Sequence, residues 1–302
     1  MTDEQSTPEH SDSPPVPESS VQATFERDWT SETRQSRFVQ RSVSRTMSDE
    51  PDSGLLSISL EAGVLRDAFR FATLPDNEVK LEFTPERLVI GSMNKSHLAT
   101  ILAEIEAEAF EEYTVSETAV WVDAVPLHQW LGLLSTDAVV HGIFNRDTGD
   151  VVFESDGLSY RTRSIATTRS KPDPHAQART RTDTVTVTGD AFDRSVTLAS
   201  PFETSLTIGI GPTEGIAELE ASSDTDHVFE RRHVRETNSD IEPVTAAFDH
   251  RYFEDLWSRI PDGRLVSISP HPDDPWIFEV PLGDDRSPVG SVKCLLRSQI
   301  RF

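Results

Sequence analysis

The sequence predicts an α+β protein made of two tandem domains of one kind, with antiparallel sheets that are covered on one face by four short helices. Three observations predict this class. A helix pattern that begins at Asp123 occurs again at Asp249, 126 positions later. Each copy leads into an extended apolar segment, residues 138–144 and 264–268. Short helices among many strands that connect without helical crossovers favour antiparallel sheets with helices on one face.

The repeated helix consists of an Asp followed by apolar residues at helical spacing. An Asp directly before such a run is favoured as the N-cap or as a first-turn acid. Both copies therefore predict a helix with one buried face, beginning at Asp123 and at Asp249. The apolar positions are Leu127, Trp130, Leu131 and Leu134, and in the second copy Phe253, Leu256, Trp257 and Ile260.

Residues 1–54 are expected to form a disordered N-terminal extension. Ser, Thr, Pro, Gln and acidic residues dominate there, and no apolar periodicity persists. Five arginines occur between Arg27 and Arg45, with aromatic residues among them. This arm either contacts DNA or a partner protein, or is a solvated tail.

The first domain is expected over residues 55–165. Alternating apolar residues predict strands at 56–60 and 79–83. A helix between them has an apolar face formed by Val64, Leu65, Ala68, Phe69 and Ala72. Residues 97–108 fit a helix by propensity, but we predict a strand because the matching segment of the second half is extended. Further strands are predicted at 88–90, 120–122, 138–144, 151–153 and 158–165.

Residues 166–182 are expected to be a linker, because they contain no Leu, Ile, Val, Met or aromatic residue. The second domain is expected over residues 183–302 and repeats the first. Its first helix face copies the earlier one 127 positions later and consists of Ala191, Phe192, Ser195, Val196 and Ala199. Its strands are predicted at 185–187, 206–210, 216–219, 227–234, 264–268, 276–280 and 291–296.

The bulk composition limits the class of protein. A chain of 302 residues with 36% hydrophobic residues can build two medium-sized cores. No apolar run approaches the roughly 18 residues of a membrane helix, and the N-terminus lacks the apolar region of a signal peptide. We therefore expect a soluble cytoplasmic protein with no membrane partner. The single cysteine, Cys294, excludes an internal disulfide and a cysteine-cluster metal site, and no cofactor is expected.

The net charge is −24, and only four of the 28 basic residues are lysines. This balance of acids and arginines resembles proteins of salt-loving archaea. In molar salt the Debye length falls to about 3 Å, so acidic self-repulsion is screened. The acidity is therefore only a weak argument against a nucleic-acid partner.

The order of elements, doubled around a linker, resembles the DNA sliding clamps of the proliferating cell nuclear antigen (PCNA) family from Leu55 to Ile300. Residues 155–160, Ser-Asp-Gly-Leu-Ser-Tyr, look like the turn that enters the last strand of the first clamp domain. Residues 191–196 look like the helix that opens the second. The resemblance implies a non-enzymatic, nucleoid-associated processivity factor. It would encircle double-stranded DNA as a ring, usually a homotrimer, with antiparallel sheets outside and four helices lining the inner face. It would tether polymerase or other replication and repair proteins.

The resemblance also implies three groups of site residues. The arginines on the DNA-facing helices would be Arg66, Arg70, Arg194, Arg251 and Arg259. The edges that pair between subunits would carry Leu158, Tyr160, Arg161 and Arg163 on one side and Val228, Glu230 and Arg232 on the other. The partner-binding residues would be Met93, His97, Arg169, Lys171, Arg179, Arg181, Ser298 and Ile300.

Two features depart from the usual clamp. Acidic residues outnumber arginines on the predicted helices, which weakens contact with DNA, although a topologically closed ring needs little affinity. The linker carries no large apolar side chain, so conventional clamp-binding peptides should bind weakly or depend on charge. Alternatively, neighbouring strands complete the apolar pocket and the linker is merely a tether.

Two other functions fit parts of the sequence. A clamp-shaped scaffold or paralogue would bind proteins without encircling DNA. Residues 270–274, Pro-His-Pro-Asp-Asp, also match a metal-binding motif of zinc-dependent deacetylases. Zinc needs further ligands that are not evident here, and a turn between two strands explains the same residues.

Overall fold

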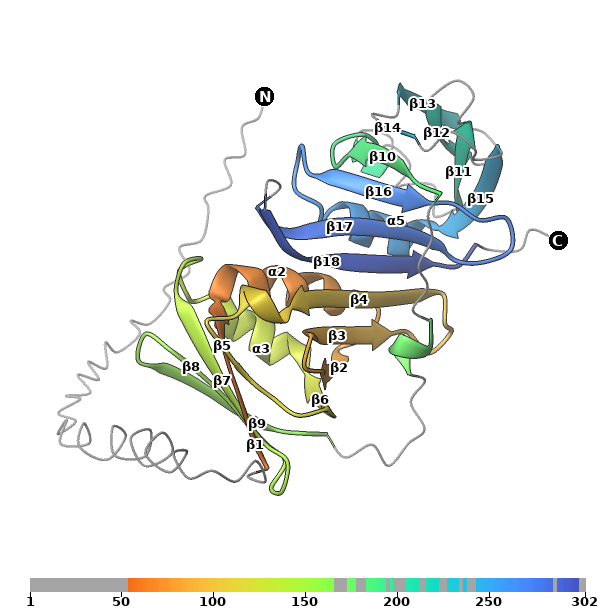
Figure 1. Ribbon diagram of the computed structural model, residues 1–302. Coiled ribbons are helices and arrows are strands. Elements are labelled where there is room, and N and C mark those ends of the chain that lie inside the picture. Colours follow the sequence, from red (N-terminus) through yellow and green to blue (C-terminus); the bar gives the residue numbers. More distant parts are fainter. Residues whose placement is uncertain are drawn as a thin grey trace, which may run out of the picture. The chain divides into compact units, whose positions relative to one another are not determined.

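The fold in Figure 1 is a computed structural model. It describes residues 54–165, 173–177, 183–193, 196–197, 205–211, 216–222, 227–233, 236–237, 243–284 and 287–298. The predicted N-terminal extension and most of the predicted linker lie outside the described residues. Every strand pair that the structure describes is antiparallel, so the predicted antiparallel α+β class is confirmed.

A five-stranded sheet is built entirely from the first half of the chain and has the order β5-β1-β7-β8-β9. The side chains of Leu56, Ile58 and Leu60 alternate along β1 and are buried, as the sequence predicts. The strands are β5 (Glu112–Thr114), β1 (Leu55–Glu61), β7 (Val139–Asn145), β8 (Asp150–Ser155) and β9 (Leu158–Arg163).

A nine-stranded sheet combines strands of both halves in the order β14-β10-β16-β17-β18-β4-β3-β2-β6. The halves meet where β4 and β18 lie side by side (Figure 1), with Ala99 opposite Leu296 and Ile105 opposite Gly290. The strands are β14 (Glu236–Thr237), β10 (Val185–Thr188), β16 (Leu265–Ser269), β17 (Trp276–Asp284), β18 (Ser287–Leu296), β4 (Ala99–Glu106), β3 (Arg87–Met93), β2 (Glu78–Phe83) and β6 (Thr118–Asp123).

A four-stranded sheet comes from the second half and has the order β13-β12-β11-β15. Its strands are β13 (His227–His233), β12 (Ile216–Ser222), β11 (Ser205–Gly211) and β15 (Val244–Asp249). Leu206, Ile208 and Ile210 of β11 are buried, which confirms the predicted alternation of this strand.

Helix α2 (Ala62–Ala72) packs against helix α3 (Ala124–Leu131) and contacts strands of both halves, including β4 and β17. Every residue of its predicted apolar face is buried. Helix α5 (His250–Trp257) contacts β15 and β11. The predicted fourth helix, 191–199, is described only in part, where the Val196 N–H donates to the Phe192 carbonyl at 2.9 Å in the α-helical pattern.

The internal repeat extends to the register of the strand pairs. Glu78, the first residue of β2, lies opposite Asp123, the last residue of β6. At the corresponding place in the second half, Ser205 begins β11 and lies opposite Asp249 at the end of β15. Each repeated helix therefore starts from an equivalent point of an equivalent strand pair.

Residues 97–108 form mainly the strand β4, followed by the short 3-10 helix η1 (Ala107–Ala109), so the strand prediction is confirmed. The strands β5 and β14 are not predicted from the sequence, because they have only three and two residues. The structure does not test the proposed boundaries of two domains within residues 54–302, and that division stays a prediction.

Candidate functional site

The two repeated helices are capped in the same way. The Asp123 carboxylate accepts a hydrogen bond from the Val125 backbone N–H at 3.1 Å, and Asp249 accepts one from the Arg251 N–H at 3.0 Å. Each bond satisfies a backbone donor that the first turn of a helix leaves unpaired. The predicted N-cap role of both acids is confirmed, and the caps fix where α3 and α5 begin.

The proposed DNA-facing arginines differ in their surroundings. Arg66 and Arg70 on α2 are half-buried, Arg251 at the start of α5 is exposed, and Arg259 just beyond α5 is half-buried. Arg194 lies outside the described residues. Arg66 donates a hydrogen bond to the Thr136 hydroxyl at 3.2 Å. Three of the four described arginines are thus held against the protein rather than extended into solvent.

Arg70 and Arg259 join the ends of α2 and α5. A terminal nitrogen of Arg259 donates to the Arg70 carbonyl oxygen and, at 3.1 Å, to the Thr73 hydroxyl. A terminal nitrogen of Arg70 donates to the Ser258 carbonyl at 3.2 Å. Carbonyl groups at helix C-termini carry partial negative charge, so cations are favoured there. These two arginines therefore hold the two halves of the chain together.

A cavity of about 360 Å³ opens beside this pair of arginines. His128 of α3 also lines it. Burial lowers the pKa of His128, and the nearby charges of Arg259, Arg70 and Arg66 lower it further, while Asp67 acts in the opposite direction. The sequence does not single out His128, because polar residues on a helix surface carry no periodic signal.

The two strands proposed as subunit edges are both edges of their sheets. β9 ends the five-stranded sheet and β13 ends the four-stranded one. Leu158 at the start of β9 is 43% exposed, which is unusual among the large apolar residues that the structure describes. The side chains proposed on β13, those of Val228, Glu230 and Arg232, lie outside what the structure describes.

Both proposed interface arginines of β9 are paired within their own hairpin. Arg163 contacts the Asp150 carboxylate at 3.2 Å and Arg161 contacts Glu154 at 4.0 Å. Both pairs are solvent-exposed, and such pairs contribute little to stability. Because their charges are already balanced, these arginines are poor candidates for driving the association of two subunits.

The proposed partner-binding residues of the turn before β4 are arranged by Asn94. Its buried side-chain carbonyl accepts hydrogen bonds from the backbone N–H groups of Leu98 at 2.8 Å and Ala99 at 3.2 Å. The turn places His97 at φ 58°, with its side chain exposed, whereas Met93 is buried. Of these two residues, only His97 offers its side chain to a partner.

The C-terminal end of β18 lies beside this turn. The Arg297 N–H donates to the Leu98 carbonyl at 2.9 Å, which continues the β4–β18 ladder beyond its last pair. The sequence assigns the turn and the residues after β18 to one binding surface, and this hydrogen bond joins the two segments. Ile300, Arg169, Lys171, Arg179 and Arg181 lie outside the described residues.

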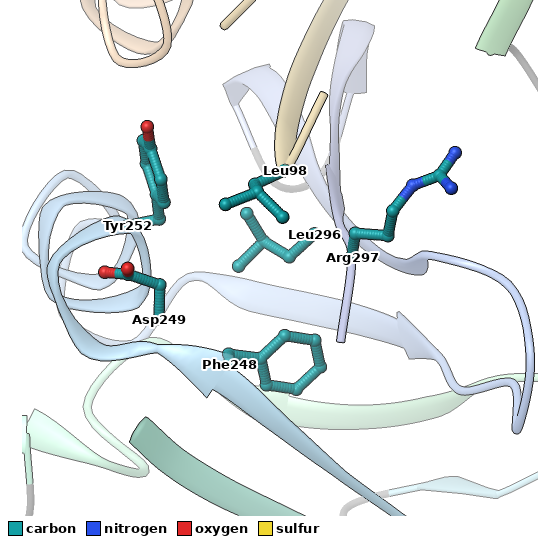
Figure 2. A pocket seen from close by; sticks show the side chains of 6 residues that line it. All are labelled: Leu98, Phe248, Asp249, Tyr252, Leu296 and Arg297. Atoms are coloured by element: carbon teal, nitrogen blue, oxygen red, sulfur yellow. The ribbon is translucent and has the colours of Figure 1, made fainter. Parts of the chain in front are cut away.

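A narrow pocket sits at the same end of the ladder (Figure 2). The side chains of Leu98, Leu296 and Phe248 gather between Tyr252 on one side and Arg297 on the other, with Asp249 below Tyr252. The Tyr252 hydroxyl lies 2.6 Å from the side-chain amide of Asn94 and ties α5 to the turn. The pocket has no room for a water molecule, so a peptide side chain would have to displace its walls.

One part of the linker is anchored on the sheet. Both carboxylate oxygens of Asp173 lie 3.1 Å from the Lys80 ammonium. Burial lowers the pKa of Lys80, but Glu82 and Asp173 outweigh this effect and raise it. The following 3-10 helix η2 (Pro174–Gln177) packs against β3 and β4. The sequence gives no signal for this contact, because the linker lacks large apolar residues.

The apolar surface available near the linker is already covered. Val89, Leu102, Ile277 and Leu295 form a cluster separate from the main core. Val89 and Leu102 belong to β3 and β4, the two strands against which η2 packs. All four residues are at most 4% exposed, so they offer no open apolar pocket.

The possible metal motif at residues 270–274 is a turn. The His271 Nδ1 accepts hydrogen bonds from the backbone N–H groups of Asp273 at 3.1 Å and Asp274 at 3.0 Å. The Trp276 indole donates to the His271 carbonyl at 3.0 Å. Among the described residues, no group of three or more His, Cys, Asp or Glu side chains could hold a metal ion. Cys294 is fully buried, and burial raises the pKa of its thiol.

Comparison with solved structures defines the class of fold. A structure described as the C-terminal region of FEN-1 bound to A. fulgidus PCNA matches with a TM-score of 0.70 and 16% identity, over 82% of this chain and 99% of that one. PCNA from Thermococcus kodakaraensis matches with a TM-score of 0.67 and 16% identity, over 81% of this chain and 100% of that one. The protein therefore has the sliding-clamp fold.

Curated relatives point to the same class. The chain is 24% identical to the DNA polymerase sliding clamp of Methanosphaerula palustris over 252 residues, which cover 82% of this chain and 99% of the relative. It is 23% identical to that of Haloarcula marismortui over 177 residues, 59% of this chain and 70% of the relative. No protein-family model matches the sequence. The predicted resemblance to sliding clamps of the PCNA family is confirmed.

No helix in the described part of the chain is long and apolar enough to cross a membrane.

Proposed function

We propose that this protein is a sliding clamp, a non-catalytic ring that encircles double-stranded DNA and tethers polymerase or other replication and repair proteins to it. The fold and the curated relatives support this function. The neighbouring structures include PCNA bound to a FEN-1 segment and a PCNA2–PCNA3 complex. Such a factor would work on the chromosome in the cytoplasm. It would use the domains 55–165 and 183–302 joined by the linker 166–182.

One observation carries the proposal. Within the chain, the two halves are joined edge to edge by β4 and β18. By the internal repeat, the counterpart of β4 in the second half is β13, and the counterpart of β18 in the first half is β9. Both of these counterpart strands lie at the edge of a sheet, and neither has a second partner strand among the residues that the structure describes. Since exposed edges invite pairing with another chain, the same joint can form between copies, head to tail, until a ring closes.

The repeat also specifies the register of that joint. Transferring the β4–β18 pairing to the counterpart strands puts Leu158 opposite Glu230, Tyr160 opposite Val228, and Arg161 opposite His227. The joint then consists of backbone hydrogen bonds and apolar contact by Leu158. Because Arg161 and Arg163 are balanced within their own hairpin, we expect ring formation to tolerate high salt.

The test is the size of the protein and its retention on DNA. We expect a closed oligomer, a trimer by the resemblance, in small-angle scattering in molar KCl. We also expect the protein to stay on nicked circular DNA and to slide off once that DNA is linearised. A strict monomer at high protein concentration, or equal loss from circular and linear DNA, would favour a clamp-shaped scaffold that does not encircle DNA.

A further inference from the structure

The cavity of about 360 Å³ at the junction of the two halves is lined almost entirely by hydrogen-bond donors. It lies where the C-terminal end of α2, the helix α3 and the turn after α5 meet. Val125 is its one apolar lining residue. The donor-bearing side chains that line it are those of Arg70, Thr73, Asn77, His128, Gln129 and Arg259. We call this cavity the junction pocket.

The junction pocket is positively charged in a strongly acidic protein. No carboxylate lines it. Among the residues that the structure describes, neither Arg70 nor Arg259 forms an ion pair with a carboxylate. Asp67 and Asp255 are the acids whose charge acts on His128 and Arg259. Two close guanidinium groups without a carboxylate partner repel each other, so an anion between them would be stabilised.

The arginines are held in place before any ligand arrives. One terminal nitrogen of Arg259 is fixed by the Arg70 carbonyl and the Thr73 hydroxyl, and one of Arg70 by the Ser258 carbonyl. A guanidinium has five N–H donors, so each arginine keeps further donors for a ligand. A planar fork that is already oriented loses less conformational entropy when it binds an oxyanion.

We propose that the junction pocket binds a phosphate group. A tetrahedral oxyanion has acceptors in several directions and matches donors that converge from three elements, and arginine forks bind phosphate with two parallel hydrogen bonds. No aromatic residue other than His128 lines the pocket, so it has no broad platform on which a base could stack. The group recognised is therefore the phosphate of the ligand and not its base.

Two sources can supply this phosphate. On a clamp, the helices α2, α3 and α5 would face DNA, so a phosphodiester of the duplex would enter the pocket. This assignment of the source rests on the proposed function. Binding of free inorganic phosphate rests on the pocket alone and needs neither a ring nor DNA.

The test is titration of the full chain with inorganic phosphate in phosphate-free buffer, at the lowest KCl concentration that keeps it folded. We expect saturable binding by calorimetry. His128→Glu puts a carboxylate in the pocket and should weaken phosphate binding by about tenfold or more. Arg146→Gln lowers the net charge by the same single unit at an exposed site outside the pocket and away from the proposed DNA-facing helices, and should leave binding unchanged. His128→Gln, which keeps a donor, should have an intermediate effect.

Unchanged phosphate binding in His128→Glu would overturn the proposal. Equal weakening by Arg146→Gln would also overturn it, because it would mean that only net charge matters. Circular dichroism of each variant checks that it is folded. A short DNA duplex titrated in parallel separates the two sources of phosphate. If His128→Glu weakens the binding of both the duplex and inorganic phosphate, the pocket binds DNA. If it weakens the binding of inorganic phosphate alone, the pocket binds a free phosphate. Retention of the wild-type protein on circular DNA tests the clamp function separately.

Discussion

Arg70 of α2 and Arg259, which follows α5, lie in opposite halves of the chain, and each binds the C-terminal end of the other half's helix. Arg259 donates to the carbonyl of Arg70 and to Thr73 at the end of α2, and Arg70 donates to the carbonyl of Ser258 at the end of α5. The sheet joint β4–β18 connects the halves through the backbone. The hydrogen bonds of Arg70 and Arg259 connect the halves a second time, through the ends of the helices.

Arg259→Ala should therefore destabilise the folded protein even without DNA. Hydrogen bonds to charged groups contribute about 1.5–3 kcal/mol each, so we expect a loss of about 2 kcal/mol in the free energy of unfolding. Denaturant unfolding in KCl measures this loss. Arg251→Ala removes an exposed arginine near the other end of α5 and should change stability by less than about 0.5 kcal/mol. Equal effects of the two substitutions would contradict the role of Arg259.

Gly290→Ala should weaken the joint between the halves. A Cβ atom at this position would overlap the backbone carbonyl of Glu104 on β4, and the backbone cannot move aside as a flexible side chain would. Overpacking of this kind costs about 1–3 kcal/mol. Ser287→Ala, at an exposed position of the same strand, is the control. A thermal melt of Gly290→Ala that matches this control would show that the strands separate easily at this point.

The proposed subunit register predicts a specific cross-link. In a chain carrying Tyr160→Cys and Val228→Cys, mild oxidation should join neighbouring subunits by a disulfide, because residues opposite each other in antiparallel strands have close Cβ atoms. Gel electrophoresis without reductant detects the covalent oligomer. Each single variant should give no covalent ring. Efficient cross-linking of Tyr160→Cys with Phe229→Cys, and not with Val228→Cys, would show that the register is shifted by one residue.

The environment of His128 predicts how stability depends on pH. Burial, and then Arg259, Arg70 and Arg66, hold its pKa in the folded protein below the ordinary value of 6.5. The unfolded chain therefore binds a proton at a higher pH than the folded chain, and stability falls as the pH drops below 6.5 towards the folded pKa. His128→Gln should make unfolding less sensitive to pH in this window. Parallel pH profiles of both proteins test this, and identical slopes would contradict it.

Partner peptides should bind weakly and through charge. A conventional clamp-binding peptide inserts one aliphatic and two aromatic side chains into an apolar pocket, and such anchors supply most of the affinity. Here the apolar cluster of Val89, Leu102, Ile277 and Leu295 is buried, and the pocket beside Leu98 is closed. We expect calorimetry to show affinity that falls as salt rises. Affinity that ignores salt, and that persists when Arg169, Lys171, Arg179 and Arg181 are replaced by Gln, would show that the linker is only a tether.

The repeat made most of the fold predictable. Local signals suffice for the caps at Asp123 and Asp249, the face of α2 and the strand β2, because each depends on neighbours a few positions away. β4 was ambiguous by propensity, and comparison of the two halves gave the correct strand.

The site was less predictable because its contacts are remote in sequence. Arg70 and Ser258 are 188 positions apart, and Lys80 and Asp173 are 93 positions apart. A periodic pattern of apolar residues along the sequence does not reveal contacts between such distant positions. The sequence identified Arg70 and Arg259 as functional candidates, but it did not show that they brace the fold or that His128 joins them around one cavity.

The unequal length of the two kinds of joint has a mechanical consequence for a closed ring. The β4–β18 joint has seven residue pairs, reinforced by the Lys293–Glu104 ion pair at 3.0 Å. The register transferred to β9 and β13 gives the joint between subunits only four residue pairs. Lys293 and Glu104 correspond to Ser159 and Arg231, and these two residues cannot form an ion pair. A ring pulled apart would therefore open between subunits and leave each protomer intact, so the joint between subunits determines where DNA enters.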